Sequence, residues 1–171
     1  MTINVKPYSP EWRRLSEEER ASISSATAPV KLGPIATALG IKVSIAFLDP
    51  SISGEIRRKS GAGHSGFAIT INKFESKPRQ RFTLAHEIAH YLLHRNIIKE
   101  CLEDNVLYRS TLSNAREAEA NRLASDIILP PNLVHEKLVE LGDKPNSVLA
   151  LALGEFFQVS DAAIKIRLGL K

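Results

Sequence analysis

The chain of 171 residues has one cysteine, Cys101, and no apolar run as long as a membrane span. A single cysteine excludes a disulfide bond within the chain. The first residues, MTINVKPYSPEWRRL, lack the apolar core of a signal peptide. We therefore expect a protein of the reducing, cytoplasmic environment.

The chain also has little excess charge. Its formal net charge is +4, whereas a dedicated nucleic-acid-binding protein usually carries a dense basic face. The basic residues are unevenly spread, since seven of them and only two acidic residues lie between Glu55 and Arg81. We interpret this segment as a solvated face, and a surface that selects a charged partner is the alternative.

Strand patterns are confined to the first half of the chain, and helix patterns dominate the second. Segments 41–47 and 66–72 alternate apolar and polar residues, and 53–59 is a second, weaker strand. The SGAGHS turn between 53–59 and 66–72 favours an antiparallel hairpin. A short helix is expected over 9–20, with Ser9 as its N-cap. Further helices are expected after Pro78 to about His94, over 113–131, and over 131–142, 147–157 and 160–169. Early strands followed by late helices indicate an α+β fold with a small antiparallel three-stranded sheet.

The stretch RFTLAHEIAHYLLH, residues 81–94, places three histidines and one glutamate in an otherwise apolar helix. Polar side chains on such a helix are costly unless something satisfies them. His86 and His90 are separated by about 40° of rotation and about 6 Å of rise, so both imidazoles can reach one metal ion. Glu87 lies close to that line but off it, where a general base for peptide hydrolysis is placed. The spacing favours a metal site over a pair of core histidines.

A catalytic zinc ion needs a third protein ligand. His94 lies on the same helix, but too far along its axis to join both other histidines. Glu117 and Glu119 begin the next helix and differ by about 200° of rotation, so they cannot both face the ion. Glu117 shares the buried stripe of Ala120 and is favoured over Glu119. Asn121, on the same side as Glu117, is expected to accept a hydrogen bond from a ligand histidine.

These motifs resemble the ImmA/IrrE family of metallopeptidases. The similarity rests on RFTLAHEIAHYLLH and EAEANRLASDIILP, and on LGIKVSIAF, SGEIRR and GFAITIN in the same order. The ending FFQVSDAAIKIRL is also typical of the family. Two positions depart from the family pattern: Ala89 stands where glycine is common, and IILP replaces Leu-Leu-Met-Pro.

The resemblance implies a zincin-like metallo-endopeptidase of the gluzincin type. It implies one divalent metal ion, zinc or alternatively manganese, held by His86, His90 and Glu117, with Glu87 as the catalytic residue and Asn121 beside the ligands. It also implies a partner, because several family members cut or disable helix-turn-helix (XRE-like) repressors and so relieve repression of stress or mobile-element genes.

The resemblance also suggests how the chain is divided. We expect an N-terminal helix and linker over residues 1–28 and a zincin-like metallopeptidase domain over 29–132. The remaining residues, 133–171, are expected to form a C-terminal helical extension that packs on the same domain.

A DNA- or protein-binding regulator with a structural metal is the competing interpretation. Residues 152–169 resemble the end of a helix-turn-helix, but only Lys165 and Arg167 there offer side chains that suit base edges. Direct DNA binding is therefore not favoured.

Peptide hydrolysis usually needs a hydrogen-bond donor that stabilises the anionic intermediate. The candidates are Tyr108, Arg109, His64 and Tyr91. Tyr91 is turned about 100° from the preceding histidine and is expected to serve packing. Cys101 has no evident activating base and is interpreted as a bystander.

Overall fold

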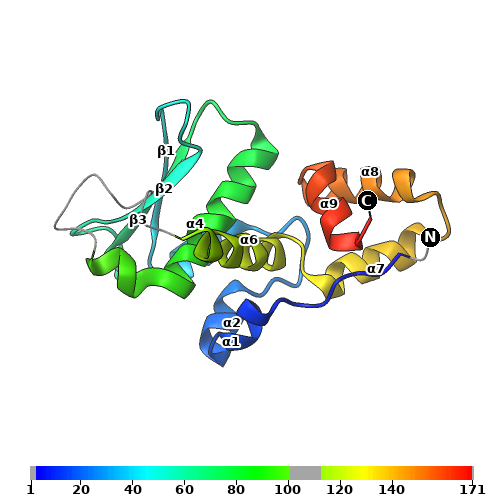
Figure 1. Ribbon diagram of the computed structural model, residues 1–171, viewed down its shortest axis with the longest axis horizontal. Coiled ribbons are helices and arrows are strands. Elements are labelled where there is room, and N and C mark those ends of the chain that lie inside the picture. Colours follow the sequence, from blue (N-terminus) through cyan, green and yellow to red (C-terminus); the bar gives the residue numbers. More distant parts are fainter. Residues whose placement is uncertain (1–2, 101–112, 171) are drawn as a thin grey trace.

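The computed structural model describes residues 3–100 and 113–170, and it shows an α+β fold (Figure 1). The sheet and α4 lie at one end, α6 lies in the middle, and α7, α8 and α9 lie at the other end. The elements are α1 (Pro10–Arg14), α2 (Glu17–Ile23), α3 (Leu32–Ala38), β1 (Lys42–Ala46), β2 (Gly54–Arg58), β3 (Phe67–Asn72), α4 (Lys77–Glu100), α6 (Asn114–Ile128), α7 (Pro131–Leu141), α8 (Asn146–Phe157) and α9 (Asp161–Leu168).

The three-stranded sheet is mixed, with the strand order β1-β3-β2. β2 pairs antiparallel with β3, which confirms the expected hairpin, but β1 pairs parallel with β3. The expectation of an entirely antiparallel sheet is therefore wrong. The reason is the connection: β2 lies between β1 and β3 in the chain, so a crossover joins these two strands, as a parallel pair requires. Phe67, Ile69 and Ile71 of β3 are almost fully buried, as expected of the central strand. On β1, by contrast, Ile45 is 57% exposed, so this strand occupies an edge.

The N-terminal segment forms two short helices where one was expected. Ser9 caps α1, as predicted, by accepting a hydrogen bond from the Trp12 backbone N–H. Ser16 then begins α2 with a capping box, in which its side chain and that of Glu19 each bond the other residue's backbone N–H. A capping box starts a new helix, and it therefore divides the expected single helix.

α4 is the central helix of the fold. It runs to Glu100, six residues beyond the expected end, and it contacts α3, α6, β2 and β3. Its buried side is made of small and branched apolar residues, among them Ala85, Ile88 and Ala89, each with no exposed surface. Among the described helices, none is by itself long and apolar enough to cross a membrane, and α8 with α9 meets that test only as a pair bent by 117°.

The C-terminal helices are joined to the rest of the molecule by a buried ion pair. Arg167 of α9 donates to Asp126 of α6 at 2.8 Å, and the two side chains are only 4% and 2% exposed. The same carboxylate accepts the backbone N–H of Ser9 at 2.9 Å, and Arg167 also donates to the Lys6 carbonyl. One carboxylate therefore connects α6, α9 and the N-terminal segment.

We expect Asp126→Asn to lower the free energy of unfolding by about 3–5 kcal/mol, because it leaves the buried Arg167 guanidinium without a counter-charge. Asp161→Asn is the matched control, since Asp161 pairs with Lys165 at a side-chain exposure of 58% and 45%. An exposed pair of this kind contributes at most about 1 kcal/mol. Urea denaturation of both variants measures the difference, and equal losses would contradict the role given to Asp126.

Candidate metal centre

Three side chains from two helices converge at one point. His86 and His90 come from α4, and Glu117 comes from the first turn of α6. His86 Nε2 lies 2.9 Å from His90 Nε2, and the two Glu117 carboxylate oxygens lie 3.3 Å from these two nitrogens. The structure therefore brings together the three residues that the sequence selected as ligands.

The spacing of these atoms fits a metal ion. In a tetrahedral zinc site with bonds of about 2.0–2.1 Å, neighbouring ligand atoms are about 3.3 Å apart. Each histidine Nε2 lies 3.3 Å from a Glu117 oxygen, Oε2 for His86 and Oε1 for His90, and one ligand atom from each of the three residues can be chosen so that all lie within 4.8 Å of one another. Two imidazoles and a carboxylate are also the donor set of many catalytic zinc sites. The residues present therefore fit a divalent ion with one coordination position left for water or substrate.

The protonation states suit the same interpretation. Burial, with the neighbouring His86 next in importance, lowers the pKa of His90 to about 3. A neutral imidazole is the form that binds a metal ion. The pKa of Glu117 is lowered, chiefly by its hydrogen bond with His86, so this side chain is a carboxylate at neutral pH. The cluster thus presents a neutral His90 ring and one anion.

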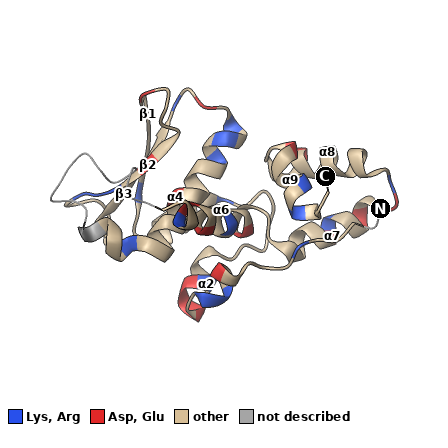
Figure 2. Ribbon diagram, viewed as in Figure 1, with Lys and Arg blue, Asp and Glu red and all other residues tan. Residues whose placement is uncertain are grey.

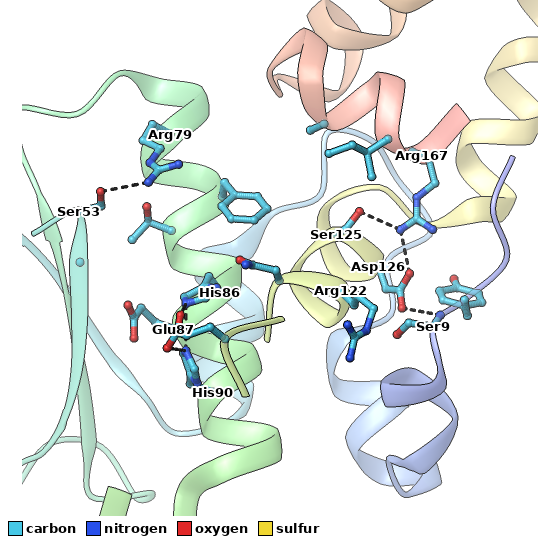
Figure 3. Close-up of a pocket in the computed structure, with 18 of the residues that line it drawn as sticks. Ser9, Ser53, Arg79, His86, Glu87, His90, Arg122, Ser125, Asp126 and Arg167 are labelled. Carbon is cyan, nitrogen blue, oxygen red and sulfur yellow. Dashed lines mark hydrogen bonds and ion pairs between the residues drawn. The ribbon is translucent and has the colours of Figure 1, made fainter. Parts of the chain in front are cut away.

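Glu87 lies between the two histidines along α4 and is 8% exposed (Figure 3). It lines the same cleft as His86, His90 and Glu117. The three clustered atoms do not include its carboxylate. Glu87 is thus a titratable side chain that shares the cleft with the candidate ligands.

Glu119 faces a different partner from Glu117, as their rotation on the helix requires. Its Oε2 lies 3.1 Å from His94 Nε2, and its Oε1 accepts from Arg14 at 2.9 Å. His94 in turn contacts His90 through Nδ1, on the side of the ring away from the cluster. The sequence interpretation gave His94 no role, although its four-residue spacing from His90 indicated this contact.

Asn121 does not make the hydrogen bond expected of it. It lines the cleft, but His90 Nδ1 is already paired with His94, at 3.0 Å. His86 Nδ1 is buried and has no hydrogen-bond partner among the described residues. The expected role of Asn121 is thus wrong for His90, because another residue of α4 lies nearer to that nitrogen.

Two of the candidate hydrogen-bond donors, Tyr91 and His64, are among the described residues. The ring of Tyr91 packs edge-on against Phe67, as expected of a packing residue, with 5.2 Å between ring centroids. His64 is exposed and lies against Gly40, where an added Cβ would collide with its ring. Neither residue lines the cleft. Tyr108, Arg109 and Cys101 lie outside the described residues.

A cleft of about 1030 Å³ connects the cluster with the C-terminal helices. One wall is formed by β2 and α4, and the other by α6, α9 and the N-terminal segment (Figure 3). The first turns of α4, which are blue in Figure 2, bring Arg79 into this cleft, where it lies 3.5 Å from Ser53 Oγ.

Comparison with known proteins agrees with this arrangement. Residues 36–169 match the peptidase M78 family, described as the IrrE N-terminal-like domain. A solved structure named Mycobacterium tuberculosis transcriptional regulator superposes with a TM-score of 0.58 at 18% identity, over 95% of this chain and 48% of that one. The chain thus spans about half the length of that protein, and at this identity the likeness concerns the fold alone. A search of curated proteins gives no match. The chain belongs to the IrrE N-terminal-like domain family of peptidases.

Proposed function

We propose that the chain is a zinc-dependent endopeptidase. The observation that carries this proposal is the convergence of His86, His90 and Glu117 within 4.8 Å at a cleft that Glu87 also lines. Membership of a peptidase family supports a metallopeptidase function in general. Zinc suits two imidazoles and a carboxylate, and manganese is the alternative ion.

Each residue has a distinct task in hydrolysis of a peptide bond. A bound zinc ion supplies Lewis acidity, which polarises a carbonyl group and brings the pKa of water toward 7. His86, His90 and Glu117 hold that ion. The Glu87 carboxylate accepts a proton as water attacks the carbonyl carbon, and then transfers this proton to the leaving amine.

The edge of the sheet offers a binding surface for a peptide main chain. In the described part of the chain, β2 pairs only with β3, so its other edge has unpaired backbone groups. Ser53, Gly54, Glu55 and Ile56 line the cleft. An extended peptide can add to such an edge as a further strand. Gly54 also lets β2 approach α4 closely, because an added methyl group would collide with the Thr83 side chain.

A helix-turn-helix repressor of the XRE-like type is the substrate we propose, cut in the cytoplasm so that stress or mobile-element genes are expressed. The ImmA/IrrE resemblance supports this choice, because several members act on such repressors. The structural neighbour is named a transcriptional regulator, which is compatible with it. Direct DNA binding has less support, because Arg167 is buried against Asp126 and Lys165 pairs with Asp161.

A structural metal in a non-enzymatic regulator is the competing function. Structural zinc sites are usually closed by four protein ligands. The cluster here contains three among the described residues, and it lies on an open cleft. This geometry favours catalysis over a structural role.

We expect His86→Ala or His90→Ala to abolish zinc binding, because two remaining ligands do not hold a zinc ion in a protein site. Elemental analysis of the purified variants measures the zinc content per chain. His135→Ala is the control, since His135 is exposed on α7 away from the cluster. Full zinc content in either His86→Ala or His90→Ala would contradict the site.

We expect Glu87→Gln to keep the fold and the zinc ion but to lower peptide hydrolysis at least about a hundredfold, because glutamine cannot accept the proton. Cleavage is followed by mass spectrometry on a peptide library and on a helix-turn-helix repressor encoded beside the gene. Glu136→Gln, on the exposed side of α7, is the control.

The outcomes of this experiment separate the two functions. Cleavage at the wild-type rate by Glu87→Gln would contradict the proposed mechanism. Relief of repression by Glu87→Gln without any cleavage would instead support a binding protein with a structural metal.

A further inference from the structure

A chain of hydrogen bonds leads from the candidate metal centre to the surface. His90 Nδ1 lies 3.0 Å from His94 Nδ1, and His94 Nε2 lies 3.1 Å from Glu119 Oε2. Arg14 of α1 donates to the other Glu119 oxygen at 2.9 Å. The chain starts at buried rings, since His90 is 2% and His94 5% exposed. It ends at Glu119 and Arg14, whose side chains are 27% and 55% exposed.

The chemistry of the outer members determines where the protons lie. The Arg14 guanidinium can only donate, and an ionised Glu119 can only accept. Glu119 accepts from the Arg14 guanidinium at 2.9 Å, and a carboxylate paired with an arginine is ionised. His94 must therefore carry its proton on Nε2 to bond Glu119. When His94 carries a single N–H, its Nδ1 is an acceptor.

The position of the proton on His90, a candidate ligand, follows from that on His94. Since His94 Nδ1 accepts, His90 must donate from Nδ1. The proton of a neutral His90 then lies on the nitrogen that faces away from the cluster. His90 Nε2, which lies 3.3 Å from Glu117 Oε1, is left with its lone pair directed into the site. This is the tautomer that a metal ion requires.

Of the two candidate histidine ligands, only His90 has a hydrogen-bond partner on Nδ1 among the described residues. His86 Nδ1 is buried without a hydrogen-bond partner in that part of the chain. Helix α6 instead supplies carboxylates on both sides of His90. Glu117 lies on the metal side, and Glu119 lies behind His94.

We propose that His94, Glu119 and Arg14 form a relay that holds His90 in its metal-binding tautomer and orientation. These three are positioning residues, not ligands, and the proposal rests on the metal site put forward above. Arg14 also lies 3.5 Å from Glu11 and is largely exposed, so its share is smaller than that of His94 and Glu119.

The test compares Glu119→Gln with a matched variant, Glu19→Gln. Glu19 also pairs with an arginine, Arg95 at 2.8 Å, and its side chain is 24% exposed. Arg95 follows His94 directly on α4, but this pair does not lead to His90. Glutamine at position 19 also keeps the capping box of α2. Both variants therefore lose one partly exposed carboxylate charge, and only one of them interrupts the relay.

Zinc dissociation constants, measured by competition with a chromogenic chelator, give the first result. Loss of a group that supports a ligand histidine weakens metal binding about 10–100-fold. We expect His94→Ala to lie within that range, Glu119→Gln near its lower limit, and Glu19→Gln to match the wild type. Because Glu119 is partly exposed, its variant remains informative even where His94→Ala does not fold.

Histidine tautomers in the zinc-loaded wild type, measured by long-range ¹H–¹⁵N NMR, give the second result. We expect the proton of His90 on Nδ1 and that of His94 on Nε2, which a merely structural contact does not require. A proton on His94 Nδ1 would overturn the relay.

The two proposals fail in different ways. A wild-type protein that binds zinc, with Glu119→Gln equal to Glu19→Gln, would overturn the relay alone. A wild-type protein that binds no zinc would overturn the metal site, and the relay with it.

Discussion

The crossing of α4 and α6 is the constraint on which the site depends. Glu117 reaches both histidines only because these two helices pack closely. Small side chains permit such an approach, and both helices bury alanines completely at their core faces: Ala85 and Ala89 on α4, and Ala120 and Ala124 on α6. Helix separation depends on the size of the residues at the contact. The apolar packing therefore positions the polar cluster.

Three carboxylates in the first two turns and the last turn of α6 contact three different parts of the fold. Two of these contacts connect α6 with the N-terminal segment and with the C-terminal helices. Glu117 faces the histidine pair, Glu119 faces His94 and Arg14, and Asp126 faces Arg167. Buried polar groups need partners, and each of these carboxylates supplies one to a different part of the fold. Glu117 and Asp126 both line the cleft between the sheet and the C-terminal helices.

The sequence predicted the features that depend on helix periodicity. Four-residue spacing placed His86 beside His90. The rotation of about 200° between Glu117 and Glu119 predicted that only one of them faces the two histidines, and Glu117 does so while Glu119 contacts His94. Features that depend on which distant segments pair with each other could not be predicted from the sequence. The parallel placement of β1 depends on which strand it pairs with, and β1 pairs with β3 across the sheet and not with the next strand in the chain. The alternation within Ile41, Val43, Ile45 and Phe47 does not reveal that Ile45 and Phe47 remain exposed. Asn121 of α6 does not bond His90, because His90 Nδ1 already pairs with His94, which lies on α4 as His90 does.

Anomalous diffraction at the zinc edge, from crystals of the zinc-loaded protein, tests the central claim most directly. We expect one strong peak bonded to His86 Nε2, His90 Nε2 and a Glu117 oxygen, at about 2.0–2.2 Å from each, with the remaining position open to solvent. A peak at another place, or a fourth protein ligand that closes the coordination sphere, would contradict it.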